Sequence, residues 1–511
     1  MKLGRDSQLV VLGAPGCGKT TALLRAVEKH LSEGVAPNDI AFVSFTRKAI
    51  REAMQRACDK FELSIGDLPF FKTVHSLCYQ QLGLGKDQVM GPSAYKEIGR
   101  ALGIEFTGAR DEDGSGLPVG GSLGDKMLFL YELSRVRCLS IEDAYHNYAD
   151  DRSFTWHHFK QFCQTVEKYR EETGLVDFTA MLEQFVAAGR TVPVSVVVVD
   201  EAQDLSLLQW EVLKVAFKDA AVIYVAGDDD QAIYKWSGAD SETFLGLNGR
   251  KIVLGRSFRI PATVHKLAQQ IIAPVSNRYV KKFAARAEEG TVEWLSSPDQ
   301  VDLTPEGSWL LLVRNVFQIP DIEELVKSRG MTYISRGGHP SVKKASTRAI
   351  VIWERLRKGE ACLGEDIRAT YDYLKVGAGV KRGFKALSKI DPECEYNISE
   401  LKKDWGLLRD DPWHDALEII PIEEREYYLT VLRRGGVKAL RDPPRVHINT
   451  IHGVKGGEAD HVMIMTDMAR RTYDQYQASP DDERRVFYVG ATRAKHNLRL
   501  VMPQTSQHFI I

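Results

Sequence analysis

The sequence predicts an α/β protein with two parallel-sheet regions, each interrupted by a mainly helical insertion. Short, β-branched apolar runs alternate with helix-like segments in the first and last parts of the chain, a pattern typical of buried parallel strands. A glycine-rich turn follows the first of these runs, and the sheet pattern disappears twice further on. At 511 residues, the chain is too long for a single core. We expect the first sheet region over residues 1–79 and 166–255 with its insertion at 80–165, and the second over 256–336 and 444–511 with its insertion at 337–443.

The composition is that of a folded globular protein, with 44% hydrophobic and 27% charged residues. No apolar run approaches the ~18–20 residues that span a bilayer, and the first residues lack the apolar core of a signal peptide. We therefore expect a cytoplasmic protein without membrane contact. The net charge of −1 argues only against a wholly basic nucleic-acid binder, because a local groove can hold a strand. The seven scattered cysteines indicate reduced thiols.

The glycine-rich turn fits the phosphate-binding pattern G-x-x-x-x-G-K-[ST]. It lies between the apolar run Leu9–Leu12 and the helix-like run Thr21–Leu31, so backbone N–H groups and a helix dipole point at one place. Lys19 is suited to neutralise the β- and γ-phosphates of a triphosphate, and the Thr20 hydroxyl to bind Mg²⁺. The turn consists of Gly13, Ala14, Pro15, Gly16, Cys17, Gly18, Lys19 and Thr20.

Two further strand and helix steps follow before the first insertion. Ile40–Thr46 is strand-like and leads into a helix-like run, Arg47–Phe61. Phe70–Cys78 looks like a short strand that enters a helix, and His75 taken alone is best explained as an ordinary structural histidine. Within the insertion, Gly108–Gly124 is rich in glycine and charge and predicts a loop.

Acidic residues follow the most strongly apolar strand. The run Val194–Asp200 is almost all valine, as in a strand buried on both faces, and its carboxyl end carries Asp200 and Glu201. Ligands of open α/β sheets bind at that edge. Asp200 is placed to hold Mg²⁺ and Glu201 to orient and deprotonate a water molecule, whereas the alternative is a strand end that faces solvent.

The next strand, Ala221–Ala226, ends in the polar segment Gly227–Ala239. Its three adjacent carboxylates, at 228–230, predict a solvated turn. Gln231 follows directly at the sheet edge, where it can reach a γ-phosphate. Tyr234 and Trp236 come just after it; aromatic residues there are usually packing residues, but a base can also stack on them.

The later part of the chain repeats the strand and helix pattern. The helix-like run Glu483–Lys495 places Arg485, Tyr488, Thr492 and Lys495 near one face, with Arg493 at its end. The segment Arg278–Lys282 is a basic patch. The later strand-like runs are Lys251–Leu254, Trp309–Val313, Val446–Thr450, Val462–Met465 and Leu498–Val501.

Taken together, these motifs resemble the superfamily 1 DNA helicases of the UvrD/Rep type, in order from residue 8 to about residue 500. The resemblance rests on nine motifs that occur together in the order typical of the family, and not on any one of them alone. The matching stretches are GAPGCGKT (13–20), FVSFTRKA (42–49), TVHS (73–76), LVDFTAML (175–182), VVVDEAQD (197–204), GDDDQAIYKWSGA (227–239), SFR (257–259), TIHGVKGGE (450–458) and YVGATRAK (488–495).

The resemblance implies two RecA-like P-loop domains with ATP and Mg²⁺ between them. In this family pattern the hydrolysis residues are Lys19, Asp200, Glu201, Gln231, Arg259 and Arg493, of which the last three contact the γ-phosphate and the two arginines come from the second domain. Phe258 stacks on adenine, Glu458 lies near the ribose, and Thr21 joins the residues of the glycine-rich turn in binding ATP. Thr20 and Asp200 hold the Mg²⁺.

For DNA, the resemblance implies a single-stranded track and binding at junctions between single and double strands. It implies movement from 3′ to 5′ with unwinding of duplex and association with the nucleoid when on DNA, whereas protein partners stay unknown. The base-stacking residues are Phe45, Tyr234 and Trp236, and the backbone-holding residues are Thr46, Arg47, His75, Thr450 and His452.

One element of the family pattern is missing, and three alternatives to a helicase stay open. The family's glutamine-containing segment upstream of the phosphate loop has no room here, and Gln8 lies within the first strand itself. The main alternative is an ATPase that is stimulated by single strands and strips proteins from DNA or RNA without unwinding duplex. A nucleotide-gated binding module without turnover fits the intact Lys19 and Glu201 less well. A small-molecule kinase needs neither the aromatic residues nor the second sheet.

Overall fold

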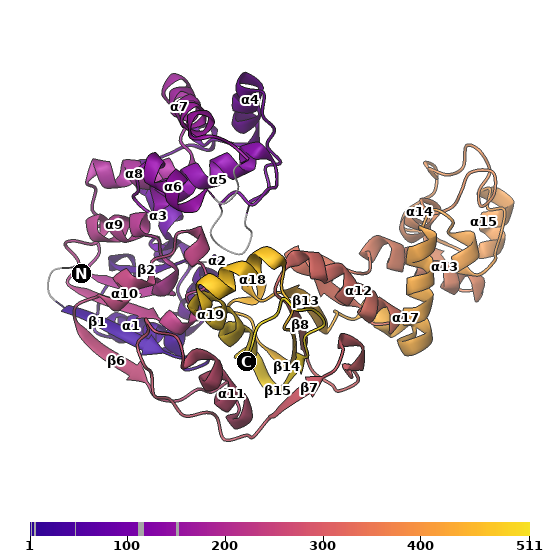
Figure 1. Cartoon of the computed structure of the whole chain (residues 1–511). Coiled ribbons are helices and arrows are strands. Elements are labelled where there is room, and N and C mark those ends of the chain that lie inside the picture. The colour runs from indigo at the N-terminus through magenta and orange to yellow at the C-terminus, as the bar shows by residue number, and fades with distance from the viewer. Residues whose placement is uncertain (2, 5–6, 46, 111–116, 150–152) are drawn as a thin grey trace. The chain divides into compact units, whose positions relative to one another are not determined.

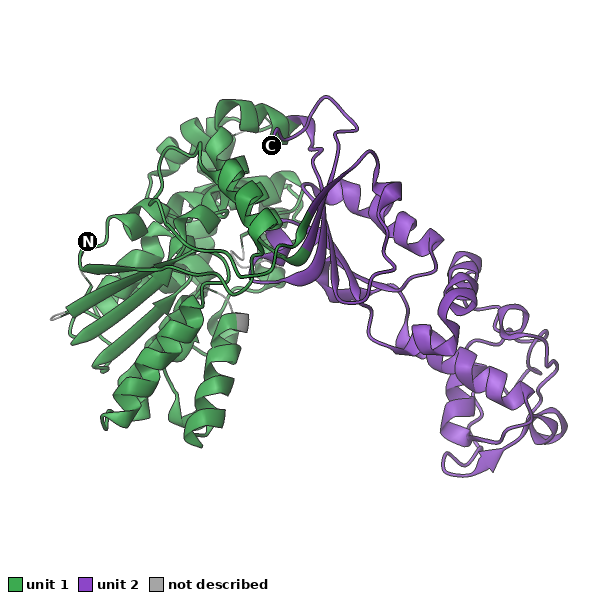
Figure 2. Ribbon diagram, turned by 90° about the horizontal axis from the view of Figure 1, so that it is seen from below, with its two compact units in different colours: residues 1–291, 471–496, 511 green, residues 292–470, 497–510 purple. Residues whose placement is uncertain are grey.

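The computed structural model describes residues 1, 3–4, 7–45, 47–110, 117–149 and 153–511, apart from the side chains of Arg47 and Lys48 (Figure 1). The chain divides into two compact units, shown in different colours in Figure 2. Unit 1 comprises residues 1–291, 471–496 and 511, and unit 2 comprises residues 292–470 and 497–510. Among the described residues, no helix is long and apolar enough to cross a membrane.

Unit 1 is built on a six-stranded sheet with the order β3-β2-β4-β5-β1-β6. All neighbouring strands run parallel, as the sequence predicts. The register pairs Leu12 with Gly227 and Ser44 with Asp200, so the carboxyl ends of the central strands share one edge. The strands are β1 (Ser7–Gly13), β2 (Ile40–Ser44), β3 (Phe71–Thr73), β4 (Val196–Asp200), β5 (Val222–Gly227) and β6 (Arg250–Leu254).

Helices cover both faces of this sheet, because β4 is apolar on both sides. Val197 and Val199 face a core formed with α3, α8 and α9, whereas Val196 and Val198 face a core formed with α1 and α2. The confirmed prediction of a strand buried on both faces thus fixes β4 at the centre of the unit. The helices are α1 (Lys19–Ser32), α2 (Arg47–Phe61), α3 (Val74–Leu82), α8 (Phe178–Ala188), α9 (Leu207–Ala216), α10 (Ser241–Leu245), α11 (Ala262–Ile272) and α19 (Pro480–Ala491).

The first insertion is helical and has a core of its own. Phe159, Phe162 and Tyr131 are buried at its centre. The hydroxyls of Ser122 and Thr155 cap the first turns of the helices that follow them, which satisfies N–H groups that have no partner within the helix. Its α-helices within the described residues are α4 (Pro92–Leu102), α5 (Leu123–Val136), α6 (Ile141–Tyr148) and α7 (Trp156–Thr173), visible together at the top of Figure 1.

The second sheet has the strand order β10-β9-β13-β8-β14-β15-β7. Its central pairs, β13 with β8 and β8 with β14, are parallel, and β10 pairs antiparallel with β9 at one edge. The sequence did not predict β7, β9 and β10, which are short or mostly exposed and so lack a continuous apolar run. The strands are β7 (Thr291–Leu295), β8 (Trp309–Val313), β9 (Tyr333–Ser335), β10 (His339–Pro340), β13 (Val446–Thr450), β14 (Ala459–Met465) and β15 (Ala494–Val501).

The insertion of unit 2 shares one continuous core with its sheet. Trp353 and Tyr428 from helices belong to the same buried cluster as Trp309 and Leu311 from β8. The insertion contains α13 (Lys344–Arg357), α14 (Gly364–Tyr371), α15 (Ile398–Asp404), α16 (Trp413–Ala416) and α17 (Ile422–Arg441), with a small antiparallel pair β11 (Cys362–Leu363) and β12 (Glu395–Tyr396). Outside it, α12 (Ile319–Ser328) lies between β8 and β9 in the chain, and α18 (Arg470–Ala478) precedes α19.

Two segments that we expected in the second sheet region pack within unit 1. Residues 256–291 and 471–496 belong to unit 1, so the division of the chain falls after residue 291. Helix α19 connects strands of the second sheet, yet it packs against α11 and against the turn after β5. This packing brings residues of the stretch YVGATRAK (488–495) into the unit that holds the glycine-rich turn.

Candidate nucleotide site and nucleic-acid interface

The glycine-rich turn connects β1 to α1 at the carboxyl edge of the first sheet. Gly16 and Gly18 have φ angles of 72° and 79°, in the left-handed region that favours glycine. Gly18 precedes the first turn of α1 and has no side chain to cap it, so the N–H groups of that turn face the loop. Lys19 is buried, and its Nζ donates to the carbonyl oxygen of Gly13 at 2.9 Å. The turn therefore has the geometry of an anion site with a cation lying across it.

Thr20 and Asp200 meet beside this turn. The Thr20 hydroxyl donates to Oδ2 of Asp200 at 2.8 Å, and Asp200 is 1% exposed. Burial, reinforced by the charge of Glu201, raises the pKa of Asp200 to about 6. A hydroxyl beside a buried carboxylate fits Mg²⁺, which takes oxygen ligands and whose charge offsets the cost of burying an ionised carboxylate.

Glu201 lies at the end of β4 in a left-handed conformation, with φ of 52°. Few residues other than glycine adopt this conformation, and such positions concentrate at functional sites. Gln203 Nε2 donates to Oε2 of Glu201 at 2.6 Å, and Gln203 Oε1 accepts the backbone N–H of Asp228 at 2.9 Å. One glutamine side chain thus connects the ends of β4 and β5.

Gln231 and Arg493 are in direct contact. Gln231 Nε2 donates to Oδ2 of Asp228 at 2.7 Å, and Arg493 Nη2 donates to Oε1 of Gln231 at 2.7 Å. Arg493 is 1% exposed and is oriented by a bond from its Nε to the carbonyl oxygen of Val489 in α19. The structure therefore brings together two residues that the sequence predicts to act on the same phosphate.

The segment that carries Phe258 and Arg259 is fastened to the glycine-rich turn. The Phe258 N–H donates to the carbonyl oxygen of Gly16 at 2.9 Å, and the Ser257 hydroxyl donates to that of Pro15 at 2.8 Å. The Phe258 ring is 69% exposed. We expected Arg259 and Arg493 to come from the second domain, but both lie in unit 1 together with the turn.

Gln8 has a structural role in β1. Its Oε1 accepts the N–H of Leu3 at 2.5 Å, and its Nε2 donates to the carbonyl oxygen of Asn248. Both ends of the amide are thus bound to the backbone, which agrees with the prediction that Gln8 lies within the strand.

The three carboxylates that follow β5 do not form a solvated turn, and that prediction was wrong. Asp228, Asp229 and Asp230 are all buried, because Lys281 lies among them and Arg278 binds the last of them. The sequence shows a basic patch at 278–282, but no spacing rule connects it with acidic residues 50 positions earlier. These residues are the main part of the site that sequence reasoning missed.

Of the predicted base-stacking residues, only Trp236 presents an exposed ring. Trp236 is 39% exposed and lies parallel to the ring of Phe129, with centroids 6.2 Å apart. Tyr234 is 2% exposed and packs against the half-buried Phe45, with centroids 5.6 Å apart. Tyr234 therefore supports Phe45 in this conformation and has no free face.

The predicted backbone-holding residues are spread over both units. In unit 1, Thr46 and the Arg47 side chain lie outside the described residues, and the His75 ring packs edge-on against Phe178 at 5.9 Å. In unit 2, Thr450 ends β13 and its hydroxyl accepts the N–H of Gly453 at 3.2 Å. In the same unit, His452 is half-buried and Glu458 is exposed.

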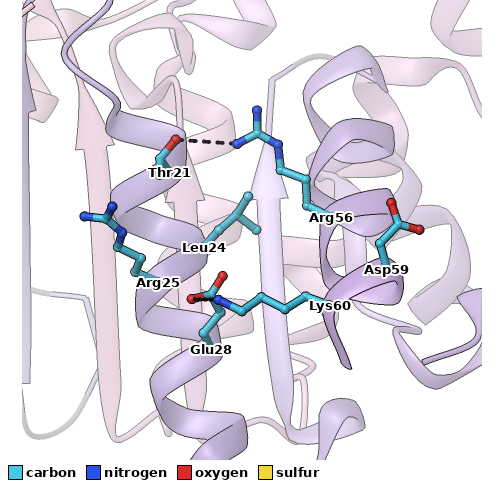
Figure 3. Close-up of a pocket in the computed structure, with 7 residues that line it drawn as sticks. All are labelled: Thr21, Leu24, Arg25, Glu28, Arg56, Asp59 and Lys60. Atoms are coloured by element: carbon cyan, nitrogen blue, oxygen red, sulfur yellow. Dashed lines mark hydrogen bonds and ion pairs between the residues drawn. The ribbon is translucent and has the colours of Figure 1, made fainter. Parts of the chain in front are cut away.

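A shallow groove runs between α1 and α2 next to the glycine-rich turn (Figure 3). Arg56 donates to the Thr21 hydroxyl at 3.4 Å, and Lys60 pairs with Glu28 at 2.6 Å. These bonds hold α2 against α1, so the groove is crossed by one hydrogen bond and one ion pair. It is lined by Thr21, Leu24, Arg25, Glu28, Arg56, Asp59 and Lys60.

Comparison with known proteins gives matches at both ends of the chain. Residues 3–237 match the model of an AAA domain, and residues 426–505 match the model of the UvrD-like helicase C-terminal domain. The ATP-dependent DNA helicase UvrD2 of Mycobacterium tuberculosis is 26% identical over 340 residues, covering 59% of this chain and 46% of that protein. The ATP-dependent DNA helicase PcrA of Staphylococcus aureus is 22% identical over 303 residues, covering 54% of this chain and 39% of that protein.

These alignments span less than half the length of the two relatives. They nevertheless agree with the geometry of the site, because the matched AAA region contains the glycine-rich turn, Asp200 and Gln231, and the matched C-terminal region contains Arg493. Both matched regions also contribute parallel strands to the two sheets. The chain is thus similar to UvrD-like helicases, through residues 426–505 to the C-terminal domain model of that family and over somewhat more than half of its length to the helicases UvrD2 and PcrA.

Proposed function

We propose that this chain is an ATP-dependent DNA helicase that moves 3′ to 5′ on single-stranded DNA and unwinds duplex. The observation that carries the proposal is the contact of Arg493 with Gln231 beside the glycine-rich turn. An arginine held next to a γ-phosphate contact is the arrangement that phosphoryl-transfer enzymes use to stabilise developing charge. The two helicase relatives support DNA as the track.

Several residues of unit 1 have separate roles in ATP hydrolysis. When bound, Mg·ATP supplies the phosphoryl group. Lys19 neutralises phosphate charge, and Thr20 and Asp200 hold the cation. Glu201 orients and deprotonates the water whose oxygen attacks the γ-phosphorus, while the bond from that phosphorus to the leaving ADP oxygen breaks.

Three side chains stabilise the charge that develops on the phosphoryl oxygens. They are Gln231, Arg259 and Arg493. Lys19 is bonded to Gly13, so it must leave that carbonyl oxygen to reach a phosphate. Phe258 has an exposed ring on which adenine can stack.

Nucleotide state and DNA grip are connected through one short segment. Gln231 and Trp236 are five residues apart in the chain and follow β5 directly. A change at the γ-phosphate contact therefore moves the aromatic residue on which a base stacks. Base stacking tolerates any sequence, as a motor that steps along DNA requires.

A basic loop in the insertion of unit 2 supports binding at junctions between single and double strands. Between Tyr373 and Ile390 the chain has five basic residues and no acidic one. Phe384 and Val376 are exposed in the same segment. A surface of this kind attracts the phosphates of a duplex arm without reading sequence. The basic residues are Lys375, Lys381, Arg382, Lys385 and Lys389.

The experiment is a steady-state ATPase assay with and without single-stranded DNA. We expect single strands to stimulate hydrolysis by the wild type, and Lys19→Ala to abolish it. We expect Trp236→Ala to lose the stimulation and to retain the rate seen without DNA. A wild-type rate that does not respond to single strands would rule out the proposed motor.

A further inference from the structure

A buried ionic cluster lies behind Gln231. This Lys281 cluster consists of Lys281, Arg278 and the three carboxylates Asp228, Asp229 and Asp230. Lys281 Nζ lies 3.0 Å from Asp228 Oδ1, 3.0 Å from Asp230 Oδ2, and closer still to Asp229 Oδ1. Arg278 binds Asp230 with two bonds of 2.7 and 2.6 Å. Lys281 is 3% exposed, so water contributes little to balancing these charges.

The charge balance of the cluster depends on Lys281. Burial alone raises the pKa of Asp228, but the charges of Lys281 and Lys19 outweigh burial and lower it. Burial raises the pKa of Asp229 above its ordinary value. Burial lowers the pKa of Lys281, and the three carboxylates outweigh burial and raise it. Three buried carboxylates without Lys281 would therefore take up protons or move apart.

Asp228 connects the cluster with the nucleotide site. Its Oδ2 accepts the amide N–H of Gln231 at 2.7 Å, and its backbone N–H donates to the Gln203 side chain that also binds Glu201. The charge of Lys19 in the glycine-rich turn acts on the same carboxylate. One aspartate thus faces Lys281 on one side and the residues that surround the γ-phosphate position on the other.

We propose that Lys281 is a positioning residue for ATP hydrolysis that acts through Asp228 and Gln231. With Asp228 ionised and compensated, its carboxylate accepts the amide N–H of Gln231. The carbonyl oxygen of that amide then faces Arg493, as observed. Lys281 itself touches no reacting atom. The inference rests on the proposed function, because it assigns Lys281 to the hydrolysis that the site performs.

Arg485 of α19 also holds the Lys281 cluster in place. Arg485 donates to the backbone carbonyl oxygens of Asp229 at 3.1 Å and Asn277 at 2.7 Å. The turn that carries the carboxylates and the segment that carries Lys281 are thus joined to α19, which ends two residues before Arg493. A displacement of the cluster is therefore expected to change the contact between Gln231 and Arg493.

The test compares Lys281→Met with Lys282→Met and Lys281→Arg. Lys282 is the next residue, is exposed, and serves as the matched control. We expect Lys281→Met to lower kcat for DNA-stimulated hydrolysis by about 10- to 100-fold, the size of effect that slight misplacement of catalytic groups produces. The KM for ATP should change less than about threefold, because Lys281 does not contact the nucleotide. Lys281→Arg should recover part of kcat, and Lys282→Met should behave as the wild type.

A double-mutant cycle with Gln231→Ala separates positioning from general stability. If Lys281 acts through Gln231, Lys281→Met should lower kcat less than about twofold further in the Gln231→Ala background. Equal losses in both backgrounds, or an unchanged kcat in Lys281→Met, would overturn the inference. If Lys281→Met does not fold, the charge-balanced Lys281→Met/Asp229→Asn variant takes its place in the same cycle. A wild type without DNA-stimulated hydrolysis would instead contradict the proposed function.

Discussion

Arg493 donates a hydrogen bond to the side-chain oxygen of Gln231 at 2.7 Å, although the two residues are 262 positions apart in the chain. The contact joins the end of α19 to the turn after β5 within unit 1. Arg493 is buried and its Nε is held by α19, so the guanidinium has one defined orientation. The candidate nucleotide site therefore includes residues from the region that matches the AAA-domain model and from the region that matches the UvrD-like helicase C-terminal model.

Replacing Arg493 by lysine should lower kcat for ATP hydrolysis strongly. An arginine that stabilises phosphoryl charge is worth about 10³- to 10⁵-fold in rate. The ammonium group of lysine cannot form the paired, coplanar hydrogen bonds that a guanidinium forms. The Arg499→Lys variant is the comparison for the loss of a buried guanidinium elsewhere, because Arg499 is 8% exposed and binds Glu293 in the second sheet. Steady-state kinetics at saturating DNA measure the effect. A rate for Arg493→Lys close to that of the wild type would contradict the role of this residue.

Gly16→Ala should abolish nucleotide binding, whereas Gly83→Ala should not. Both glycines have left-handed φ angles, 72° and 70°, so an alanine at either position costs about 1–2 kcal/mol. A Cβ at Gly16 would also lie 2.4 Å from the Cβ of Arg259, whereas one at Gly83 meets nothing within 4 Å. Fluorescence titration with a labelled ATP analogue measures binding. Equal affinities for the two variants would contradict the close fit of the turn against Arg259.

Trp236→Ala should weaken the binding of single-stranded DNA without changing the fold. Stacking of a base on an aromatic ring is worth about 1–3 kcal/mol, which corresponds to roughly 5- to 150-fold in affinity. Trp294 in β7 is similarly exposed, at 45% against 39%, and Trp294→Ala is the matched control. Fluorescence anisotropy with labelled oligonucleotides gives the affinities. An equal loss in both variants would show that Trp236 is not a specific contact.

Asp177 should stabilise unit 1 above about pH 4 and lose this effect in acid. Burial raises the pKa of Asp177, but the charges of Arg135 and Arg170 outweigh burial and lower it. A carboxylate with a lowered pKa in the folded state stabilises the fold above its unfolded value of about 3.9, and the effect disappears as the pH falls through the folded value.

The measurement is the thermal unfolding of Asp177→Asn and of the exposed control Asp219→Asn between pH 7 and pH 3. Asp177→Asn should be clearly less stable than the wild type at pH 7, by about 3–5 kcal/mol for a broken buried ion pair. The difference should shrink as the pH falls below about 3.9, because the unfolded chain then takes up a proton at Asp177 that the folded protein does not. A difference that is the same at both pH values would contradict the ion pair as its cause.

Periodicity and motifs predicted the sheets, because a strand that is buried on both faces has a continuous apolar sequence. The valines of β4 form such a run, and the location of Asp200 and Glu201 at the carboxyl edge follows from the geometry of parallel sheets. The short edge strands have no such apolar run; β10, for example, consists only of His339 and Pro340, and both are exposed.

The burial of Asp228, Asp229 and Asp230 could not be predicted, because it depends on a cation more than 50 positions away. Carboxylates in a run are normally solvated, and only the tertiary contact with Lys281 reverses this preference. The same holds for Tyr234, which the motif predicts to stack on a base and which the structure buries against Phe45. Such features follow from packing between distant segments, and local sequence rules do not contain them.

The most direct test of the proposed motor is ATP-dependent strand displacement on two partial duplexes, one with a 3′ single-stranded tail and one with a 5′ tail. The proposed helicase opens only the duplex with the 3′ tail, and the Lys19→Ala variant opens neither. If the wild type opens neither duplex while single strands still stimulate ATP hydrolysis, the helicase proposal is contradicted. The chain would then be an ATPase that moves on single strands without unwinding duplex.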